Sequence, residues 1–399
     1  MSLISTQIKE YLQTQSWIRR MFEAATELRA KYGEENVFDF SLGNPDLPPP
    51  AEVGDALSSL VKDINKPLSI GYCANAGRPA VRAAVAAKVS EEQQIPLAAN
   101  HIVMTAGAAG ALNVLFRTIL QSGEEVVCHA PYFVEYGFYA GNYGAFLKTV
   151  MSKDQTFRVD VDQLQRAINP NTRALLINSP NNPTGVVYTR EEIAAIAQLL
   201  RDKSAEYGRP ILLISDEPYR FLTFDNIQAP PLLPAYEYSV VVSSFSKSLS
   251  LAGERIGYIA VNPLMDGVDL LLNGIILANR ILGFVNAPVI GQEIIRKSLQ
   301  SNVDISIYER RRRAMASLLD DMGFEYSMPQ GAFYFFPRVP QGYTDTEFID
   351  LLMTENIIAV PGSGFGCPGY FRLTYCMDTD IINNSRPAWE RLKQKIQQA

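Results

Sequence analysis

The chain has 399 residues, a length typical of two or three domains rather than of one compact core. Hydrophobic residues make up 47% of it and charged residues 20%, as in an ordinary globular enzyme. The formal net charge of −6 argues against nucleic acid as a partner, and the two histidines are too few for a histidine-rich metal site, so we predict no metal centre. The four cysteines show no CxxC spacing, and we expect free thiols in a reducing, cytoplasmic compartment.

The sequence shows no signal for export or for membrane insertion. Its first residues lack the basic start and apolar core of a signal peptide. The longest apolar region, residues 268–290, contains Asp269, Asn273, Arg280 and Asn286, each of which is costly in lipid. We expect this region to be a core or subunit-interface segment, and we expect no membrane partner.

The N-terminal part predicts a helix, a short strand and a rigid loop. Apolar residues recur at helical spacing over residues 16–32, and Gly33 is a plausible end for that helix. Residues 38–42 predict the strand. The proline-rich run 43–50 follows, and we expect it to form a hinge between two domains.

The middle of the chain alternates short apolar runs with helical patterns. This alternation predicts a mostly parallel sheet that is covered by helices on both faces. Ligands of such sheets bind outside the carboxyl ends of the strands, where Asn182, Asp216 and residues 244–247 are placed. The expected strands cover residues 101–105, 125–128, 174–178, 211–215, 240–243 and 256–261, and the helices between them include residues 110–120 and 190–203.

The pattern changes from residue 292 onward and predicts a smaller α+β domain. A long charged helix is expected over residues 292–322, followed by strands over 332–336 and 370–374, with helices near 346–355 and at the C-terminus. The four consecutive arginines at 310–313 are compatible with an anion site. We favour a solvated helix face for them, because charge runs on helices usually face water.

Lys247 is the most informative residue, because it lies among small hydroxyl residues directly after a buried apolar strand. Burial disfavours the charged form of lysine, so Lys247 is expected to be a competent amine nucleophile for a carbonyl. Ser244, Ser246 and Arg255 are the kinds of donor that a phosphate beside this amine would need. An amine next to a phosphate pocket predicts an aldehyde cofactor that carries a phosphate, which is pyridoxal phosphate.

Three further residues fit the ring of such a cofactor. Asp216 is the candidate for the carboxylate that keeps the ring nitrogen protonated. The alternative, a strand-end carboxylate that caps a helix, is less favoured because Lys247 follows one strand later. Tyr219 and Asn182 would hydrogen-bond the phenolic oxygen, although the run around Asn182 is also simply a good turn.

Small residues open the helix after the first strand of the sheet. Gly107, Ala108 and Ala109 would let backbone N–H groups approach a phosphate, and the helix dipole would favour it. The alternative is a tight strand-to-helix turn without a ligand. Phe133 would stack on the cofactor ring or would belong to the core. Arg372 lies in an apolar strand and needs an anionic partner, which is either a substrate carboxylate or a structural aspartate.

Taken together and in this order, these motifs resemble the fold type I, class I and II aminotransferases that depend on pyridoxal phosphate, and most of all the aspartate and aromatic aminotransferases. The resemblance implies an α/β fold, with a large domain around a central, mostly parallel, seven-stranded sheet sandwiched by helices, and a smaller α+β domain. Residues 1–45 would form an N-terminal arm and part of the small domain. Residues 46–290 would form the large cofactor-binding domain, and residues 291–399 the small C-terminal domain.

The resemblance also implies a role for each matched residue. Lys247 would be the Schiff-base lysine and the acid and base of the 1,3-proton shift, while Asp216 would pair with the ring nitrogen. Arg372 would bind the α-carboxylate of the substrate, with Gly43 and Asn182 beside it.

Other matches are less complete. Phe133 takes the ring-stacking position, where the aspartate enzymes usually carry tryptophan. Ala108 and Ala109 replace more polar residues of the phosphate loop, so backbone donors remain there. Tyr72 matches a tyrosine that reaches the phosphate of the neighbouring subunit, which implies a homodimer with shared active sites.

The implied reaction is a ping-pong transfer, through a Lys247 aldimine, of the amino group of an L-amino acid to a 2-oxo acid such as 2-oxoglutarate. Aspartate or aromatic donors are favoured. By hypothesis Arg280 binds a distal carboxylate, and an interface salt bridge is its alternative role. A carbon–sulfur β-lyase on the same scaffold is the alternative function. A regulatory protein with an aminotransferase-like sensor domain is disfavoured, because no basic DNA-binding module precedes Gly43.

Overall fold

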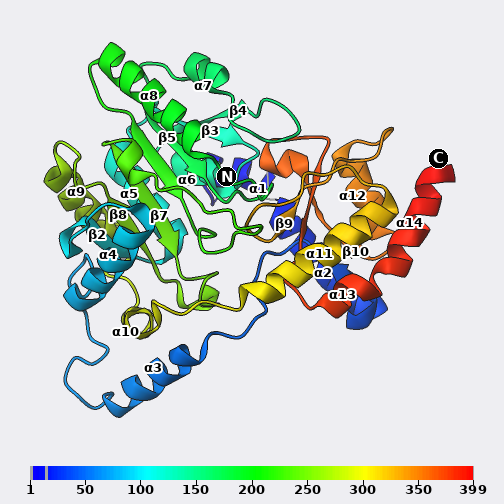
Figure 1. Cartoon of the computed structure of the whole chain (residues 1–399), viewed down its shortest axis with the longest axis horizontal. Helices are drawn as coiled ribbons and strands as arrows, with labels where there is room; N and C mark the ends of the chain where they lie inside the picture. Colours follow the sequence, from blue (N-terminus) through cyan, green and yellow to red (C-terminus); the bar gives the residue numbers. More distant parts are fainter. Residues whose placement is uncertain (1–2, 14–16, 399) are drawn as a thin grey trace.

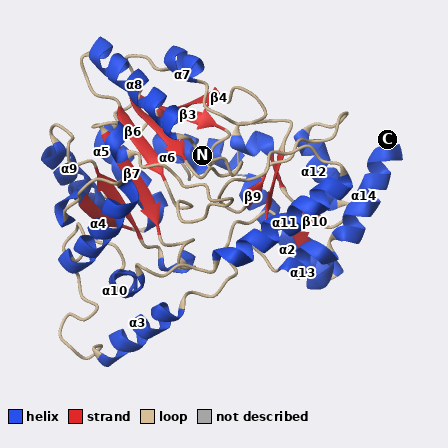
Figure 2. Cartoon of the chain, in the orientation of Figure 1, coloured by secondary structure: helices blue, strands red, loops and turns tan. Residues whose placement is uncertain are grey.

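The computed structural model describes residues 3–13 and 17–398. A large part with a central sheet lies on the left of Figure 1, and a smaller part, mostly yellow to red, lies on the right. Helices surround the strands of the large part, as Figure 2 shows. Within the described ranges, no helix is both long and apolar enough to cross a membrane.

The large part contains a seven-stranded sheet in the order β2-β8-β7-β6-β5-β3-β4. Strand β8 runs antiparallel to both of its neighbours, and the other pairs in this sheet are parallel. The expected mostly parallel, seven-stranded sheet is therefore confirmed. Its strands are β2 (Ile102–Thr105), β3 (Glu125–Ala130), β4 (Phe146–Met151), β5 (Thr172–Asn178), β6 (Leu212–Asp216), β7 (Ser239–Ser244) and β8 (Gly257–Val261).

Alternating side chains of these strands supply two hydrophobic cores, one on each face of the sheet. Leu213 belongs to one core and Ile214 to the other, as the two-residue period of a strand requires. Helices α5 (Gly107–Ile119) and α9 (Val268–Ile281) contribute to the core that holds Ile214. Helices α4 (Pro79–Gln93) and α8 (Arg190–Tyr207) contribute to the opposite core. With both faces covered, ligands can reach the sheet only at its ends.

The smaller part contains two short sheets. Strand β1 (Phe38–Asp39) pairs with β10 (Ile357–Ile358), so the segment near the N-terminus joins the C-terminal part. Strands β11 (Val360–Pro361), β12 (Phe371–Thr374) and β9 (Tyr334–Phe335) form the second sheet. The remaining α-helices are α1 (Thr6–Gln13), α2 (Trp17–Tyr32), α3 (Ala51–Lys62), α6 (Glu135–Gly141), α7 (Val161–Ala167), α10 (Val289–Ser298), α11 (Ile305–Met322), α12 (Asp345–Met353), α13 (Thr379–Asn384) and α14 (Arg386–Gln398).

The elements differ from the predictions at two places, and one predicted boundary lies outside the described residues. The helix expected over residues 292–322 is two helices, α10 and α11, because Asp304 caps a new helix by accepting a hydrogen bond from the Ser306 amide. Strand β4 was not expected. The predicted start of the first long helix at Ser16 lies outside the described residues.

The expected solvated face of the arginine run is wrong for two of its members. Arg311 binds Asp46 through two hydrogen bonds of 2.6 and 2.7 Å, and its side chain is 5% exposed. Arg312 binds Asp225 through two hydrogen bonds of 2.8 Å. Only the flanking Arg310 and Arg313 are exposed. The run therefore ties α11 to loops of the large part of the chain.

Candidate active site

A cavity of about 260 Å³ opens at the carboxyl ends of β5, β6 and β7, next to Arg372 of the smaller part. This is the location expected for a ligand of a parallel sheet. Twelve of the predicted site residues line it: Gly43, Ala108, Ala109, Phe133, Asn182, Asp216, Tyr219, Ser244, Ser246, Lys247, Arg255 and Arg372.

Lys247 lies in the turn that follows β7 and lines the cavity. Its Nζ donates a hydrogen bond of 2.6 Å to the carbonyl oxygen of Gly43. Burial lowers the pKa of Lys247 to about 8, and the positive charges of Arg372 and Arg255 act in the same direction. A substantial fraction of the amine is therefore neutral near physiological pH, as a nucleophile or a base requires.

Asp216 ends β6 and is buried, yet its carboxylate is only half satisfied. Oδ2 accepts a hydrogen bond of 2.6 Å from the hydroxyl of Tyr136, whereas Oδ1 is buried and has no hydrogen-bond partner within the described chain. Burial raises the pKa of Asp216 to about 7, and the Tyr136 bond opposes that rise. An unpartnered carboxylate oxygen at a cavity wall is a place for a donor from a ligand.

The N-terminus of α5 and Arg255 form another part of the cavity wall. Gly107 has a φ of 72°, and a Cβ at this position would lie 2.9 Å from Nη2 of Arg255. At Gly257, a Cβ would lie 2.6 Å from the carbonyl oxygen of Ser243. Glycine is therefore needed at both positions for strand, helix and guanidinium to come together. Backbone N–H groups, a helix dipole and a cation here suit an anion.

Arg372 lies on β12 with 2% of its surface exposed. Its Nη1 donates a hydrogen bond of 3.0 Å to Oδ1 of Asn182, and its Nη2 donates one to the carbonyl oxygen of Ser41. Its Cζ lies 4.6 Å from the ring centre of Tyr334 and 4.8 Å from that of Phe365. Burial lowers the pKa of Arg372, and its Nε has no hydrogen-bond partner among residues 3–13 and 17–398. No structural aspartate from these residues pairs with it, so its charge is available to a ligand.

Two tyrosines, Tyr219 and Tyr334, line the same cavity as Lys247. The hydroxyl of Tyr219 lies 2.8 Å from that of Tyr334. Burial raises the pKa of both phenols, which keeps them protonated and able to donate. A Cβ at Gly43 would overlap the Tyr334 hydroxyl, which explains the glycine there. Phe133 meets Tyr136 edge to face, with ring centres 5.5 Å apart.

Sequence reasoning missed several residues of the cavity. Tyr136 and Tyr139 come from α6, Asn178 ends β5 and Tyr334 comes from β9. Tyr136 follows Phe133 by about one helical turn, a spacing that could have placed the two on one face. Tyr334 had no local signal, because its neighbours in the sequence are aromatic core residues.

Tyr72 and Arg280 are the two predicted site residues that the chain does not bring close to the cavity. Tyr72 is 88% exposed and lines a separate surface hollow together with Asn286. Arg280 is exposed on α9. The described chain tests neither role, so both stay predictions.

Comparisons with known proteins show the family of the chain. A model of the family aminotransferase class I and II matches residues 35–385. An aspartate aminotransferase from Bacillus sp. (strain YM-2) is 31% identical over 88% of this chain and 90% of its own length. The aromatic-amino-acid aminotransferase 2 of Thermococcus litoralis is 30% identical over 95% of this chain and 96% of its own length.

A solved structure extends the likeness to three dimensions. The crystal structure of an aminotransferase from Eubacterium rectale is 37% identical, has a TM-score of 0.94 and covers 99% of both chains. These relatives favour amino-group transfer over the carbon–sulfur lyase alternative. The chain therefore belongs to the class I and II aminotransferases, and it is a pyridoxal-phosphate-dependent enzyme of fold type I.

Proposed function

We propose that the cavity around Lys247 binds pyridoxal 5′-phosphate, and that the enzyme moves an amino group from aspartate or an aromatic L-amino acid to a 2-oxo acid such as 2-oxoglutarate. The observation that carries this proposal is the Asp216 carboxylate, whose Oδ1 has no partner in the described chain although it is buried at the cavity wall. A protonated ring nitrogen is the donor that this oxygen lacks.

The other groups of the cavity fit the rest of the cofactor. Lys247 provides the amine for its aldehyde. Arg255, Ser244 and the N-terminus of α5 provide donors for its phosphate. Phe133 offers an aromatic face for its ring. When bound, pyridoxal phosphate supplies an aldehyde that bonds to amines and a ring that withdraws electrons from the substrate Cα.

The residues of the chain then perform the proton and binding steps. Nζ of Lys247, released by the incoming amino group, would accept the proton that leaves the substrate Cα and would pass it, in the 1,3-shift, to the carbon that carried the aldehyde of the cofactor. A pKa of about 8 suits both halves of that task. Arg372 and Asn182 bind the α-carboxylate, which orients the Cα–H bond toward Lys247. Closure of the smaller part over that carboxylate would exclude water.

The proposed domain division follows the sheets. Residues 46–290 would form the large domain, and residues 1–45 would join residues 291–399 in the small one. The pairing of β1 with β10 supports this division. The four free cysteines support a reducing, cytoplasmic compartment.

A homodimer is part of the proposal. Apolar side chains of α9 are exposed, with Leu270 at 80% and Ile281 at 55%, and such surface favours a subunit interface. In the dimer, Tyr72 would reach the phosphate of the neighbouring subunit. Arg280 would either bind a distal substrate carboxylate there or form an interface salt bridge.

A panel of amino donors with 2-oxoglutarate tests the main proposal. The protein should be yellow with pyridoxal phosphate, should be bleached by borohydride, and should form the oxo acids of aspartate or of aromatic amino acids. Lys247→Ala should abolish the reducible colour. Lys203→Ala, which removes a lysine on α8 that pairs with Glu206, should leave it unchanged. Pyruvate and ammonia released from cystathionine without an oxo acid would contradict the aminotransferase.

Arg280→Ala tests the choice of donor. If Arg280 binds the distal carboxylate, kcat/KM should fall about 10- to 100-fold with aspartate and stay nearly constant with phenylalanine. An equal loss with both amino acids would assign Arg280 to the interface instead.

A further inference from the structure

Glu217 directly follows the cofactor-site aspartate, but it does not line the cavity. Glu217 is the first residue after β6, and its side chain bonds to Gln93 of α4 and to Arg220 instead of lining the cavity beside Asp216. It is only 4% exposed. A buried carboxylate adjacent to a ligand-binding carboxylate is costly, and it calls for a specific role.

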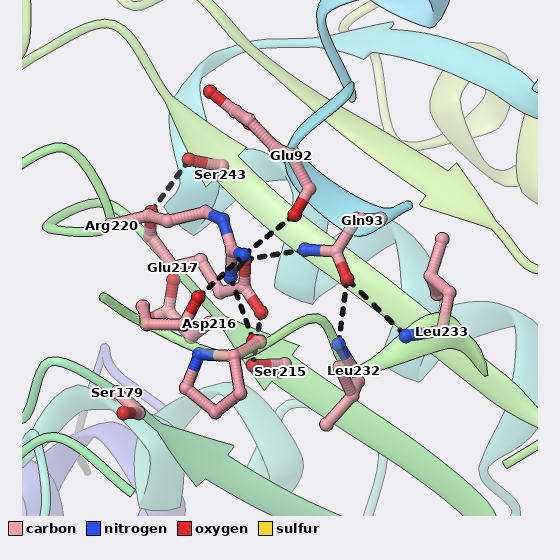
Figure 3. A network of polar contacts seen from close by, with 12 residues as sticks. Glu92, Gln93, Ser179, Ser215, Asp216, Glu217, Arg220, Leu232, Leu233 and Ser243 are labelled. Carbon is pink, nitrogen blue, oxygen red and sulfur yellow. Dashed lines mark hydrogen bonds and ion pairs between the residues drawn. The ribbon is translucent and has the colours of Figure 1, made fainter. Parts of the chain in front are cut away.

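Both oxygens of the Glu217 carboxylate accept hydrogen bonds, as Figure 3 shows. Oε1 accepts a hydrogen bond of 2.8 Å from the hydroxyl of Ser215. Oε2 accepts one of 2.9 Å from Nε2 of Gln93 and one of 3.1 Å from Nη1 of Arg220. Two neutral donors and one cation suit an ionised carboxylate.

The donors are themselves fixed by the backbone. Oε1 of Gln93 accepts hydrogen bonds from the amides of Leu232 and Leu233, at 2.8 and 3.2 Å, which sets the direction of its amide group. Nη2 of Arg220 donates to the carbonyl oxygens of Glu92 and Ala229, at 2.7 and 2.8 Å. This network therefore joins α4, the end of β6 and the loop before β7.

The main chain of Glu217 is held as firmly as its side chain. Its amide donates a hydrogen bond of 2.8 Å to the carbonyl oxygen of Val242. Its carbonyl oxygen accepts a hydrogen bond of 2.9 Å from the hydroxyl of Ser243. The peptide that joins Asp216 to Glu217 is thus anchored to β7. Asp216 itself has one side-chain partner, Tyr136, and an open oxygen.

We propose that Glu217 is a positioning residue of the cofactor site: it holds Asp216 in place from behind and adds a second negative charge that favours a protonated cofactor ring. This inference rests on the proposed binding of pyridoxal phosphate. It assigns to Glu217, with Gln93 and Arg220, a part in the electron-sink chemistry although none of the three touches the cavity.

The charges around Glu217 decide the sign of its effect. Burial raises the pKa of Glu217, while the Arg220 guanidinium and the Ser215 hydroxyl oppose that rise and Glu92 of α4 adds to it. The negative charge of Glu217 in turn raises the pKa of Asp216, and that of Tyr258 on β8. A negative charge near Asp216 favours a proton on the pair that Asp216 forms with a ring nitrogen.

Glu217→Gln isolates this charge. In the variant, the amide oxygen can accept from Gln93 and Arg220 at the position of Oε2. The amide NH₂ can donate to Ser215, because a hydroxyl can rotate to accept. We expect the apparent pKa of the cofactor ring nitrogen, followed by NMR with an isotopic label at that nitrogen, to fall by about one unit in the holoenzyme, a tenfold change in protonation. The affinity for pyridoxal phosphate should fall in parallel.

Two further variants complete the test. Glu355→Gln makes the same change at a buried carboxylate that pairs with Arg391 and Lys395 between α12 and α14, and it should leave the ring pKa unchanged. Ser215→Ala removes one donor to Glu217 without a change of charge and should shift the ring pKa by less than Glu217→Gln does.

The outcomes separate the two proposals. A wild-type protein that does not bind pyridoxal phosphate would overturn the proposed function. A wild-type protein that binds it with a protonated ring, together with a Glu217→Gln variant of unchanged ring pKa and affinity, would overturn only the role of Glu217. So would an equal shift in the Glu355→Gln variant, because the effect would then be a general consequence of losing a buried carboxylate.

Discussion

Two buried arginines on the smaller part of the chain differ in their partners. Arg311 on α11 lies at the junction with the large part, and both of its terminal nitrogens bind the carboxylate of Asp46. Arg372 on β12 lies at the cavity, where it binds an amide oxygen and a carbonyl oxygen and packs between two aromatic rings. The junction arginine has a countercharge from the chain itself, and the cavity arginine has none among the described residues.

The same contrast holds for two adjacent carboxylates. Glu217 accepts hydrogen bonds on both oxygens and pairs with Arg220, whereas Asp216 has one oxygen without a partner. In each pair the group that has a countercharge from the chain lies outside the cavity lining, and the group without one among the described residues lines the cavity. A buried charge that the chain leaves unsatisfied costs free energy, and a ligand of complementary charge can recover that cost.

Among the changes that test this contrast, Arg372→Lys should have the largest effect on activity. Lysine keeps the positive charge but loses the two-pronged geometry that matches a carboxylate. Loss of such a contact costs about 2–5 kcal/mol, so we expect kcat/KM to fall on the order of 100-fold. The midpoint of thermal unfolding should change little, because no buried carboxylate loses its partner. Arg338→Lys, at an exposed pair with Glu325, is the control. A large loss of stability without a loss of kcat/KM would mean that Arg372, like Arg311, stabilises the fold and does not bind the substrate.

Asp216→Asn should stabilise the cofactor-free protein at neutral pH. The folded-state pKa of Asp216, about 7, lies above its ordinary value of 3.8. The folded state therefore holds the proton more tightly, and the stability that this contributes is lost as the pH rises from about 4 to 7. Asparagine does not titrate. We expect the free energy of unfolding of the variant, measured with urea, to exceed that of the wild type by an amount that grows over this pH range to about 2–4 kcal/mol and then levels off.

The corresponding change at Glu217 provides the contrast. Glu217→Gln should show a smaller pH-dependent gain, because its hydrogen bonds and Arg220 compensate for its burial. If Asp216→Asn raised the free energy of unfolding by the same amount at pH 4 and at pH 7, the pKa of Asp216 would not be raised in the folded protein.

Arg311→Met should affect stability more than catalysis. Methionine keeps much of the apolar stem but removes two charged hydrogen bonds, at a cost of about 2 kcal/mol. The full penalty of an unpaired buried charge is not expected, because the Asp46 side chain is 36% exposed. Arg313→Met, at a side chain that is 73% exposed, should cost less than about 0.5 kcal/mol. Equal urea midpoints for the two variants would contradict the structural role of Arg311.

The sequence predicted the parts of the site that local patterns determine. Asp216 ends one apolar strand and Lys247 comes three residues after the end of the next, so their place at the sheet edge could be inferred without knowledge of the packing. Tyr136 and Tyr334 could not be inferred in this way. Each meets its partner, Asp216 or Tyr219, across 80 or 115 positions of the chain, and only the packing of α6 and β9 brings them there.

The errors in the fold have the same origin. The run of arginines suggests a solvated face, because the partners of Arg311 and Arg312 are 265 and 87 positions away. Strand β4 lies at the edge of the sheet with Phe146 62% exposed, so it lacks the continuous apolar run of a central strand. Neither an ion pair between residues far apart in the sequence nor the edge position of a strand gives a clear signal in the local sequence pattern.

The smallest predicted effect concerns the pH at which Lys247 reacts. In the cofactor-free protein, the rate at which a small amine-reactive reagent modifies Lys247 should reach half its maximum near pH 8, because burial and the nearby cations disfavour the charged amine. Lys203, whose pKa is raised by Glu206, is the internal reference and should react only at much higher pH. Mass spectrometry of the two peptides measures both rates in one sample.

Arg372→Met sharpens this measurement and returns to the contrast between the two arginines. Arg372 contributes to the low pKa of Lys247, so loss of its charge should move the Lys247 midpoint upward. Arg311→Met should leave the pH midpoint of Lys247 modification unchanged. Asp46 neutralises the charge of Arg311, and neither residue of this pair contributes to the lowered pKa of Lys247. A shift of equal size in both variants would mean that the unpaired charge of Arg372 is not what distinguishes the cavity from the junction.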